Sequence, residues 1–272
     1  MTDFSSVKGK VAVVTGAESG MGKSIASLFA ENGMKVVLAD INEEGGQKIT
    51  DELKAKGCDV VFCKTDVSKE SDVQNMVNLA MKTWGRLDGI VNNAGIGGDF
   101  APLHECTMDE YDKLMSINLR GVFMGMKYGI EAILKSKSKA GFVICTASLG
   151  GLQGSAGTVI YTASKHGVVG LVRNAALDYA KHNITVNALC PGAVRTGIWM
   201  GLPDEAIDQM AKDMDLSPNG RVAEPDEIGY MALFLASDMA RYISGAAISI
   251  DAAAGAGRAM SVFPWRNPGI LD

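Results

Sequence analysis

The chain has 272 residues, of which 47% are hydrophobic and 21% are charged, a balance typical of a globular protein with a substantial core. The net charge is −5 and no basic run occurs, which argues against nucleic acid as a partner. No apolar run approaches the ~20 residues of a membrane span, and the start of the chain lacks the apolar core of a signal peptide. We therefore expect a cytoplasmic protein with no membrane partner.

Short apolar runs alternate with longer amphipathic segments along the chain. The apolar runs are rich in valine and isoleucine on both faces, as in parallel strands covered by helices; they span residues 10–15, 35–40, 59–63, 87–93, 141–147, 184–190 and 246–251. Helical patterns span residues 21–32, 43–56, 70–84, 109–135, 158–182 and 225–237. This alternation predicts an α/β fold with a seven-stranded, parallel, doubly wound sheet and helices on both faces. Residues 193–222 and the tail after Asp251 are expected to be irregular.

The cysteines and histidines show no pattern of a disulfide framework or a metal site. No CxxC pair occurs, so we expect buried free thiols in a reducing cytoplasm. The three histidines lack metal-ligand spacing, and we predict no metal site. These residues are Cys58, Cys63, Cys106, Cys145, Cys190, His104, His166 and His182.

Three glycines lie where the first predicted strand turns into the first predicted helix, in the sequence TGAESGMGKSIA of residues 15–26. Such a turn needs positive φ and a close approach of the backbone to a ligand, which glycine allows. The helix that follows offers unpaired N–H groups to a pyrophosphate. The spacing of Gly16, Gly20 and Gly22 differs from the commoner G-x-G-x-x-G, and a tight turn without a ligand is the alternative interpretation.

The second predicted strand ends in Asp40, eighteen residues after Gly22. A carboxylate in this position accepts hydrogen bonds from the hydroxyls of an adenosine ribose and repels a 2′-phosphate. Ile41 follows instead of arginine, and the glycine loop carries Glu18 instead of a basic residue. We therefore predict NAD(H) rather than NADP(H) as the cofactor.

Five motifs follow one another in order: TGAESGMG, NNAG at 92–95, CTAS at 145–148, YTASK at 161–165 and PGAVRT at 191–196. Together they resemble the short-chain dehydrogenase/reductase family in its NAD-type form, over about residues 8–251. The resemblance implies a single Rossmann-type, NAD-binding catalytic domain over residues 1–272. A lid is expected at about 193–222 and a C-terminal extension at about 252–272.

Tyr161 and Lys165 lie four residues apart, so on a helix their side chains share a face. A tyrosine base near neutral pH needs a pKa lowered by ~3 units, or about 4 kcal/mol. One positive charge ~5 Å away at an effective dielectric of ~20 supplies about 3 kcal/mol, so we expect a lysine and the positive nicotinamide ring together to supply most of the shift. A surface pair is the alternative for this spacing alone. The resemblance implies that Tyr161 is the general acid/base, and that Lys165 lowers its pKa and holds the nicotinamide ribose.

Two further polar residues complete the expected catalytic set. Ser148 lies just past the fifth predicted strand, at the end of the sheet where α/β folds bind ligands. The resemblance implies that it holds the substrate oxygen, with Thr146 as the alternative. Asn118 lies inside a predicted helix, where its propensity is unfavourable, and indicates a kink or an interhelical hydrogen bond. The resemblance adds that Asn118 holds a water linking Lys165 to solvent.

The resemblance also assigns cofactor contacts beyond the glycine loop. It implies that Asn92 and the backbone after it brace the sheet and flank the adenosine ribose, and that Asp66 and Val67 contact the adenine. It also implies that Val194 and Thr196 bind the nicotinamide carboxamide. The expected cofactor contacts are Gly16, Glu18, Ser19, Gly20, Met21, Gly22, Asp40, Ile41, Asp66, Val67, Asn93, Ala94, Gly95, Tyr161, Lys165, Pro191, Gly192, Val194 and Thr196.

Residues 197–216 are rich in methionine and other apolar side chains, which adapt to irregular apolar shapes. This composition favours a bulky secondary alcohol or ketone, such as a hydroxysteroid or bile acid, a terpenoid or a cyclic ketone; simple helix packing is the alternative. Phe100 is expected to border the cleft. The expected substrate contacts are Ser148, Leu149, Tyr161, Trp199 and Met200.

These features predict an NAD(H)-dependent oxidoreductase that acts on a small-molecule secondary alcohol or ketone. Two alternatives stay open: a 3-oxoacyl thioester reductase, and a non-catalytic NAD-sensing or scaffold protein on the same fold. The family commonly forms tetramers, and the long apolar helices 109–135 and 158–182 suggest subunit contacts. We therefore expect a homotetramer or a homodimer.

Overall fold

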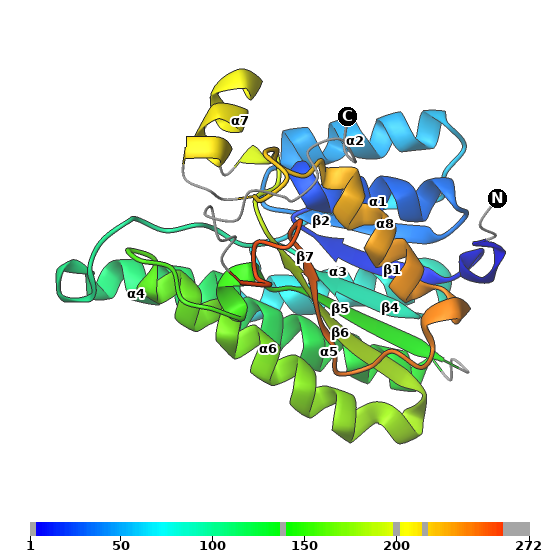
Figure 1. Cartoon of the computed structure of the whole chain (residues 1–272). Coiled ribbons are helices and arrows are strands. Elements are labelled where there is room, and N and C mark those ends of the chain that lie inside the picture. The colour runs from blue at the N-terminus through cyan, green and yellow to red at the C-terminus, as the bar shows by residue number, and fades with distance from the viewer. Residues whose placement is uncertain (1–3, 137–139, 198–201, 214–216, 258–272) are drawn as a thin grey trace, which may run out of the picture.

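A computed structural model describes residues 4–136, 140–197, 202–213 and 217–257. Its seven strands form one parallel sheet in the order β3-β2-β1-β4-β5-β6-β7 (Figure 1), which confirms the predicted sheet. The strands are β1 (Val11–Thr15), β2 (Lys35–Asp40), β3 (Val60–Lys64), β4 (Gly89–Asn92), β5 (Gly141–Thr146), β6 (Ile184–Pro191) and β7 (Ala247–Ile250).

Helices cover both faces of this sheet (Figure 1). The helices α1 (Gly20–Glu31), α2 (Glu43–Ala55) and α8 (Pro225–Ala236) pack on one face, and α3 (Glu70–Trp84), α5 (Val122–Lys135) and α6 (Val159–Tyr179) pack on the other. Successive strand residues face opposite sides. Val11 and Val13 accordingly join the core under α3, α5 and α6, whereas Ala12 and Val14 join the core under α1, α2 and α8.

The long helix predicted at 109–135 is three segments in the structure. α4 (Met108–Met115) is followed by a π-helical stretch, Ser116–Gly121, and then by α5. A π-helical stretch contains an extra residue per turn and is often found at functional sites. Asn118 lies within this stretch, so the α-helix is interrupted at the position where its propensity is unfavourable.

The region 193–222 is not wholly irregular, because it contains helix α7 (Asp204–Asp213). Two acids, Asp204 and Glu205, stand in its first turn, where the helix dipole favours negative charge. Ile207 and Ala211, four residues apart, bury one side of it. The prediction that this segment is irregular was wrong, because the apolar pattern that indicates the helix consists of only these two buried side chains.

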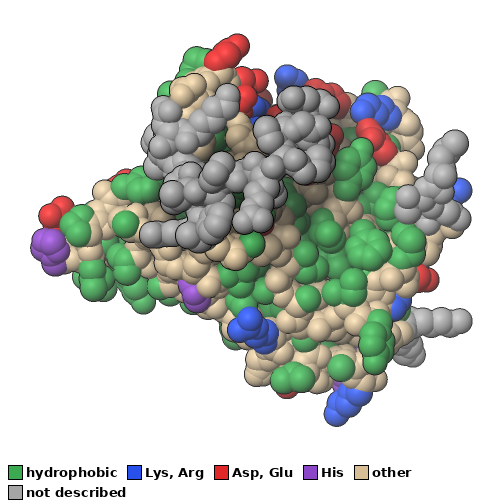
Figure 2. All heavy atoms as spheres, viewed as in Figure 1, with side chains coloured by type: hydrophobic (Ala, Val, Ile, Leu, Met, Phe, Trp, Pro, Cys, Tyr) green, Lys and Arg blue, Asp and Glu red, His purple; other side chains and the backbone are tan. Residues whose placement is uncertain are grey.

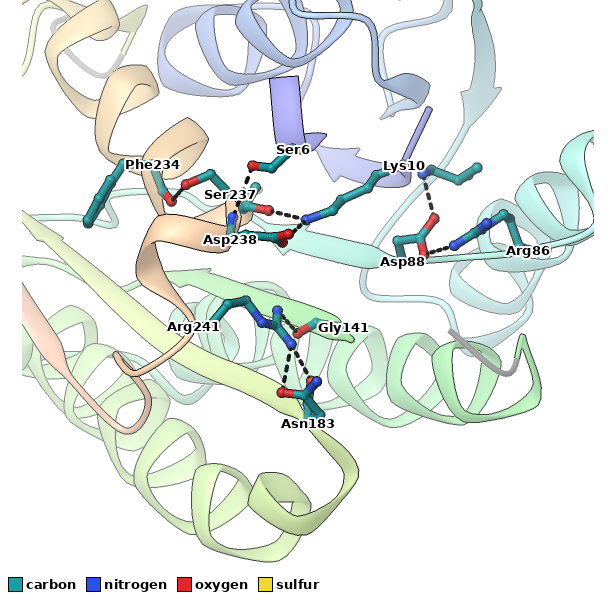
Figure 3. Close-up of polar contacts among 12 residues, drawn as sticks. Ser6, Lys10, Arg86, Asp88, Gly141, Asn183, Phe234, Ser237, Asp238 and Arg241 are labelled. Atoms are coloured by element: carbon teal, nitrogen blue, oxygen red, sulfur yellow. Dashed lines mark hydrogen bonds and ion pairs between the residues drawn. The ribbon is translucent and has the colours of Figure 1, made fainter. Parts of the chain in front are cut away.

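The amino ends of the strands are tied together by charged groups (Figure 3). The Lys10 ammonium donates to the Ala236 carbonyl (3.0 Å) and to the Asp238 carboxylate (2.9 Å). Asp88 is buried and accepts the Val11 N–H (2.9 Å). These bonds join segments more than 70 residues apart and hold the end of the sheet opposite the glycine turn.

Among the described residues, no helix is long and apolar enough to cross a bilayer, and no group of three or more His, Cys, Asp or Glu side chains is arranged to hold a metal ion. All five cysteines are free thiols. Cys145 and Cys190 are buried as predicted, but Cys58, Cys63 and Cys106 are only partly buried, because they lie outside the central strands β5 and β6.

Candidate active site

The predicted glycine turn has the geometry of a close-fitting cradle at the carboxyl end of β1. Gly16 and Gly20 adopt φ values of +66° and +51°, a conformation that residues with a Cβ rarely adopt. A Cβ on Gly22 would lie 1.9 Å from the Gly16 carbonyl oxygen, so only glycine fits there. The side chain of Ser19, the N-cap residue of α1, makes no capping bond. The N–H groups of Met21 and Gly22 in the first turn of α1 are thus available to an anionic ligand, whereas the Lys23 N–H donates to the Ser19 carbonyl (3.1 Å).

Asp40 lies beside this turn at the end of β2. Its Oδ2 accepts the Glu18 N–H (3.0 Å) and its Oδ1 accepts the Asn42 N–H (3.0 Å). These bonds fix the carboxylate next to the glycine loop. The Glu18 side chain packs against Gly45 at the start of α2, and Ile41 is exposed. The carboxylates of Glu18 and Asp40 therefore both lie in this part of the site.

A hydrogen-bond network braces the segment after β4. The Thr15 Oγ1 accepts the N–H groups of Asn93 (2.9 Å) and Ala94 (3.0 Å), and Asn93 Nδ2 donates to the Thr15 carbonyl (3.1 Å). The Thr146 hydroxyl donates to Asn93 Oδ1 (3.1 Å). Asn93 thereby joins β1 to β5. Asn92, which was expected to brace the sheet, is buried and donates to the Cys145 sulfur at 3.7 Å.

The same network occupies the polar groups of Thr146, the alternative to Ser148. The Thr146 hydroxyl is engaged by Asn93, and its carbonyl accepts the Lys165 ammonium (2.9 Å). Thr146 therefore connects β5 to Asn93 through its hydroxyl and to Lys165 of α6 through its carbonyl. The side chain of Ser148 lies beyond the strand end, accepts the Gly150 N–H (3.1 Å) and hydrogen-bonds with Tyr161.

Asn118 is fully buried in the π-helical stretch and clamps the chain after β4. Its Oδ1 accepts the Ile96 N–H and its Nδ2 donates to the Ile96 carbonyl, both at 2.8 Å. A Cβ on Gly95 would lie 3.2 Å from Asn118 Oδ1 and 3.4 Å from Lys165 Nζ. The side chains of Asn118 and Lys165 thus both approach the space that a side chain at position 95 would fill.

Tyr161 and Lys165 lie on α6 and face the same way, as their spacing predicted. Lys165 Nζ lies 5.6 Å from the centroid of the Tyr161 ring. The two side chains, Ser148 and the Thr146 carbonyl form one continuous polar group at the end of β5. The geometry brings a hydroxyl, a phenol and a buried ammonium together at the carboxyl edge of the sheet.

Burial controls the pKa values of this group. Burial raises the pKa of Tyr161, and the hydrogen bond from Ser148 lowers it to a smaller extent. Burial lowers the pKa of Lys165 to about 8, so the ammonium is still mostly protonated at pH 7. In the protein alone Tyr161 is therefore a neutral phenol, and the lowered phenol pKa expected from the sequence does not arise from Lys165 alone.

A family model described as Enoyl-(Acyl carrier protein) reductase matches residues 16–253. The chain belongs to the short-chain dehydrogenase/reductase family. It is 40% identical over 244 residues to 3beta-hydroxysteroid dehydrogenase 2 of Eggerthella lenta, a match that covers 89% of this chain and 94% of that protein. As a member of this family, the protein is an oxidoreductase.

Two solved structures share the fold of this dehydrogenase/reductase. Levodione reductase superimposes with a TM-score of 0.85 and 35% identity, over 92% of this chain and 99% of that one. The 3-ketoacyl-(acyl-carrier-protein) reductase of Brucella melitensis, in complex with NADH, gives a TM-score of 0.82 and 31% identity, over 92% of this chain and 100% of that one.

The segment after β3 lies at the edge of the site in this dehydrogenase/reductase. The Asp66 carboxylate accepts the Ser68 N–H (3.0 Å) and hydroxyl (2.6 Å) and lies 3.4 Å from the Lys69 ammonium. These contacts, led by the Ser68 hydroxyl, lower the pKa of Asp66. Val67 packs against Gly121 of the π-helical stretch.

The segment after β6 returns toward the glycine loop. Pro191 ends the strand, and the Gly192 N–H donates to the Ile250 carbonyl (3.0 Å). Val194 is buried and pairs with Ala223 in a single parallel bridge. A Cβ on Gly20 would lie 3.0 Å from Thr196 Cγ2, so Thr196 lies directly over the glycine turn, as the motif order requires.

The expected substrate residues are only partly placed. Leu149 follows Ser148 and packs against Gly255 beyond β7. Trp199 and Met200 lie outside the described residues. Apolar side chains are exposed on the arm formed by α4 and the loop before it, at the left of Figure 2; they include Phe100, Leu103 and Met108.

Sequence reasoning missed two bracing residues of this site, Thr15 and Ile96. Thr15 is a buried hydroxyl at the end of an otherwise apolar strand, and that change of polarity is a signal that marks it. Ile96 contributes only its backbone groups. Nothing in the identity of its side chain signals this role.

Proposed function

We propose that the protein interconverts a secondary alcohol and a ketone with NAD(H), on a bulky apolar substrate such as a hydroxysteroid or bile acid, a terpenoid or a cyclic ketone. The observation that carries the proposal is the grouping of Ser148, Tyr161 and Lys165 at the carboxyl end of β5. A phenol hydrogen-bonded to a serine and set beside a buried ammonium is suited to hold a substrate oxygen and exchange a proton with it.

The glycine turn and Asp40 support a dinucleotide without a 2′-phosphate. The turn leaves room for a pyrophosphate at the start of α1. Asp40 is held beside the turn with Glu18 next to it, so a 2′-phosphate would meet two negative charges and no cation from this loop. We therefore propose NAD(H), with Ile41, Asp66 and Val67 beside the adenosine.

The nicotinamide ring, when bound, accepts or supplies the hydride. The chain's own residues provide orientation and the proton. Ser148 holds the substrate oxygen, and Tyr161, neutral in the protein alone, donates its proton to a ketone oxygen or receives one from an alcohol. For alcohol oxidation, the Lys165 charge, 5.6 Å from the centroid of the Tyr161 ring, stabilises the phenolate; a separation of ~5 Å at an effective dielectric of ~20 corresponds to about 3 kcal/mol.

Asn118 and the segment after β4 support a route by which the proton returns to solvent. The Asn118 amide clamps both backbone groups of Ile96. Gly95 has no side chain, and Asn118 Oδ1 and Lys165 Nζ lie 3.2 and 3.4 Å from where its Cβ would be, close enough for one water to bridge them. We propose that Asn118 holds such a water, and that Pro191, Gly192, Val194 and Thr196 fix the nicotinamide end of the cofactor.

The substrate class is supported by two relatives and by exposed apolar side chains. The relative from Eggerthella lenta is named for a hydroxysteroid, and levodione reductase shares the fold. Exposed Phe100, Leu103 and Met108 add an apolar rim on the arm that contains α4. We propose that Leu149, Trp199 and Met200 contact the apolar body of the substrate.

An absorbance assay tests the proposal. The purified protein is incubated with NADH or NADPH and a panel of steroid, terpenoid and cyclic ketones, and with NAD⁺ and the matching alcohols. We expect turnover of a bulky secondary alcohol or ketone, with a lower KM for NADH than for NADPH. Turnover confined to NADPH would overturn the cofactor assignment.

The 3-oxoacyl thioester reductase is the second candidate, favoured by the shared fold with the Brucella melitensis reductase. Adding acetoacetyl-CoA to the same panel separates the two functions. A kcat/KM for the thioester above that for every cyclic or steroid ketone would favour the second candidate. The intact Ser148, Tyr161 and Lys165 group disfavours a non-catalytic sensor.

We further propose that the chain acts as one domain, as a homotetramer or homodimer in the cytoplasm. Exposed Phe123 on α5 and Leu177 on α6 support association of these helices with a second copy, and the five free thiols fit a reducing compartment. Light scattering coupled to size-exclusion chromatography tests the oligomeric state.

A further inference from the structure

Arg195 binds three carboxylates that come from two different segments of the chain. Its Nε donates to Glu224 Oε1 (2.9 Å), its Nη2 to Asp208 Oδ1 (2.8 Å), and its Nη1 lies 3.1 Å from Asp204 Oδ1. Nη1 also lies 3.4 Å from the Asp204 carbonyl. Asp204 and Asp208 belong to α7, and Glu224 is the N-cap residue of α8. The guanidinium therefore fastens α7 to the start of α8.

The backbone of Arg195 is itself anchored. Its N–H donates to the Ala223 carbonyl (2.8 Å), and the Ala223 N–H donates to the Ala193 carbonyl (2.9 Å). These bonds flank the bridge between Val194 and Ala223. Arg195 thus extends from a braced segment, between two residues proposed to contact the nicotinamide carboxamide, Val194 and Thr196.

Helix α7 has few apolar attachments by comparison. Its described buried side chains, Ile207 and Ala211, meet only Val222 and the partly buried Ala193. The other helices on the sheet join one of two large cores. For this reason the charged contacts of Arg195 contribute a large share of what holds α7.

A cavity of about 630 Å³ lies between α7 and the glycine turn. Gly20, Thr196, Arg195, Leu202 and Ile207 are among the residues that line it. The position of α7 therefore sets the shape of a space that borders the proposed cofactor contacts. Acidic side chains are prominent on α7, at the top of Figure 2.

We propose that Arg195 is a positioning residue that couples α7 to the nicotinamide-binding segment 193–196. This inference rests on the proposed function. With Arg195 in place, the two α7 carboxylates and Glu224 converge on one cation. Without it, three negative charges face one another, and their repulsion displaces α7 from the cavity wall. A lysine preserves the charge but not the planar fork that reaches several carboxylates at once.

The experiment compares Arg195→Gln and Arg195→Lys with Arg221→Gln in the full-length protein. Arg221 is the control, because its guanidinium pairs directly with Glu227 of α8 (2.7 and 2.8 Å) and attracts Asp208 of α7 only as a weaker, longer-range charge. Amide hydrogen exchange of residues 204–213 measures the attachment of α7 without any ligand. NADH titration and steady-state kinetics measure its consequence for binding.

We expect Arg195→Gln to speed exchange in 204–213 about 10-fold and to raise the Kd for NADH and the substrate KM by a similar factor, with kcat changed less than about 3-fold. Arg195→Lys should be intermediate. Arg221→Gln should match the wild type in exchange at 204–213 and in KM. Salt screens the ion pairs of Arg195, so the wild-type KM should rise with salt concentration. The KM of Arg195→Gln should not depend on salt, because this variant lacks those ion pairs.

Equal exchange in 204–213 for Arg195→Gln and Arg221→Gln would overturn the coupling. Faster exchange in 204–213 with an unchanged Kd for NADH and an unchanged substrate KM would also overturn it. In that case Arg195 would hold α7, but the attachment of α7 would have no effect on binding. Asp208→Asn, which alters one α7 contact and leaves segment 193–196 intact, provides the test if Arg195→Gln does not fold. A failed substrate screen would count against the proposed function alone, because exchange and NADH titration need no substrate.

Discussion

The two ends of the parallel sheet carry different kinds of polar side chain. At the amino end, charges pair with opposite charges: Lys10 with Asp238, and Arg86 with Asp88 (Figure 3). At the carboxyl end, Lys165 donates to a main-chain carbonyl and lies beside a neutral phenol. The amino end is closed by its own contacts, whereas the carboxyl end keeps unneutralised groups facing the site.

This difference separates stability from chemistry within one sheet. Contacts such as Arg241 Nη1 with the Gly141 carbonyl (3.0 Å) join distant segments and satisfy partly buried backbone groups, so they lower the free energy of the folded state. A buried ammonium without a carboxylate partner raises it. The protein tolerates this unfavourable group at the end where the motifs and the glycine turn converge. Variants at each end should therefore affect different measurements.

The largest expected effect is on catalysis at the carboxyl end. Tyr161→Phe removes the proposed proton donor and should lower kcat about 10³-fold, with a change in unfolding free energy near 1 kcal/mol from the lost Ser148 hydrogen bond. NADH turnover and urea unfolding measure the two quantities. Tyr179→Phe, at the far end of α6, is the control. A Tyr161→Phe variant that kept more than about a tenth of the activity would contradict the proposed role.

The buried ammonium should appear in the dependence of stability on pH. The pKa of Lys165 is lowered to about 8 from 10.5, so between these values the unfolded chain binds more protons and stability rises with pH. Relative to Lys165→Met, wild-type unfolding free energy should increase by up to about 3 kcal/mol between pH 8 and pH 10.5. The difference between the two proteins cancels the thiol titrations they share. Parallel curves would show that Lys165 keeps its ordinary pKa.

At the amino end, Asp88→Ala should reduce stability and spare catalysis. It leaves the buried Val11 N–H without its acceptor, at a cost of about 2 kcal/mol. Asp88→Asn, which keeps an acceptor oxygen, should lose less. Urea unfolding measures the loss, and kcat should stay at the wild-type value below the unfolding transition. A fall in kcat without a loss of unfolding free energy would contradict the assignment of stability to the amino end of the sheet and catalysis to the carboxyl end.

The smallest effect is expected for Lys10→Met. The ammonium is mostly buried, but Asp238 is 63% exposed, so solvent screens the pair, and the loss should be about 1 kcal/mol. Differential scanning fluorimetry in low and high salt measures it. The gap between wild type and variant should narrow as salt increases, while kcat stays constant. A gap independent of salt would assign the stabilisation to the Ala236 carbonyl instead of Asp238.

Much of the site could be predicted because its residues act through fixed spacing. Tyr161 and Lys165 are one helical turn apart, and Gly16, Gly20 and Gly22 surround a single strand-to-helix turn. Local geometry therefore decides their relation. The bonds of Thr15 to Asn93 and Ala94, and of Asn118 to Ile96, join segments far apart in the chain. No local pattern specifies them.

The sequence by itself determined the parallel sheet, the order of its motifs and the pairing of a tyrosine with a lysine on one helix face, because periodicity and short spacing encode these features. The tertiary structure decided that Asn93 rather than Asn92 joins β1 to β5, and that Thr146 bonds to Asn93 and Lys165. It also decided the pKa directions of Tyr161 and Lys165. These depend on burial, which arises only when distant segments pack together.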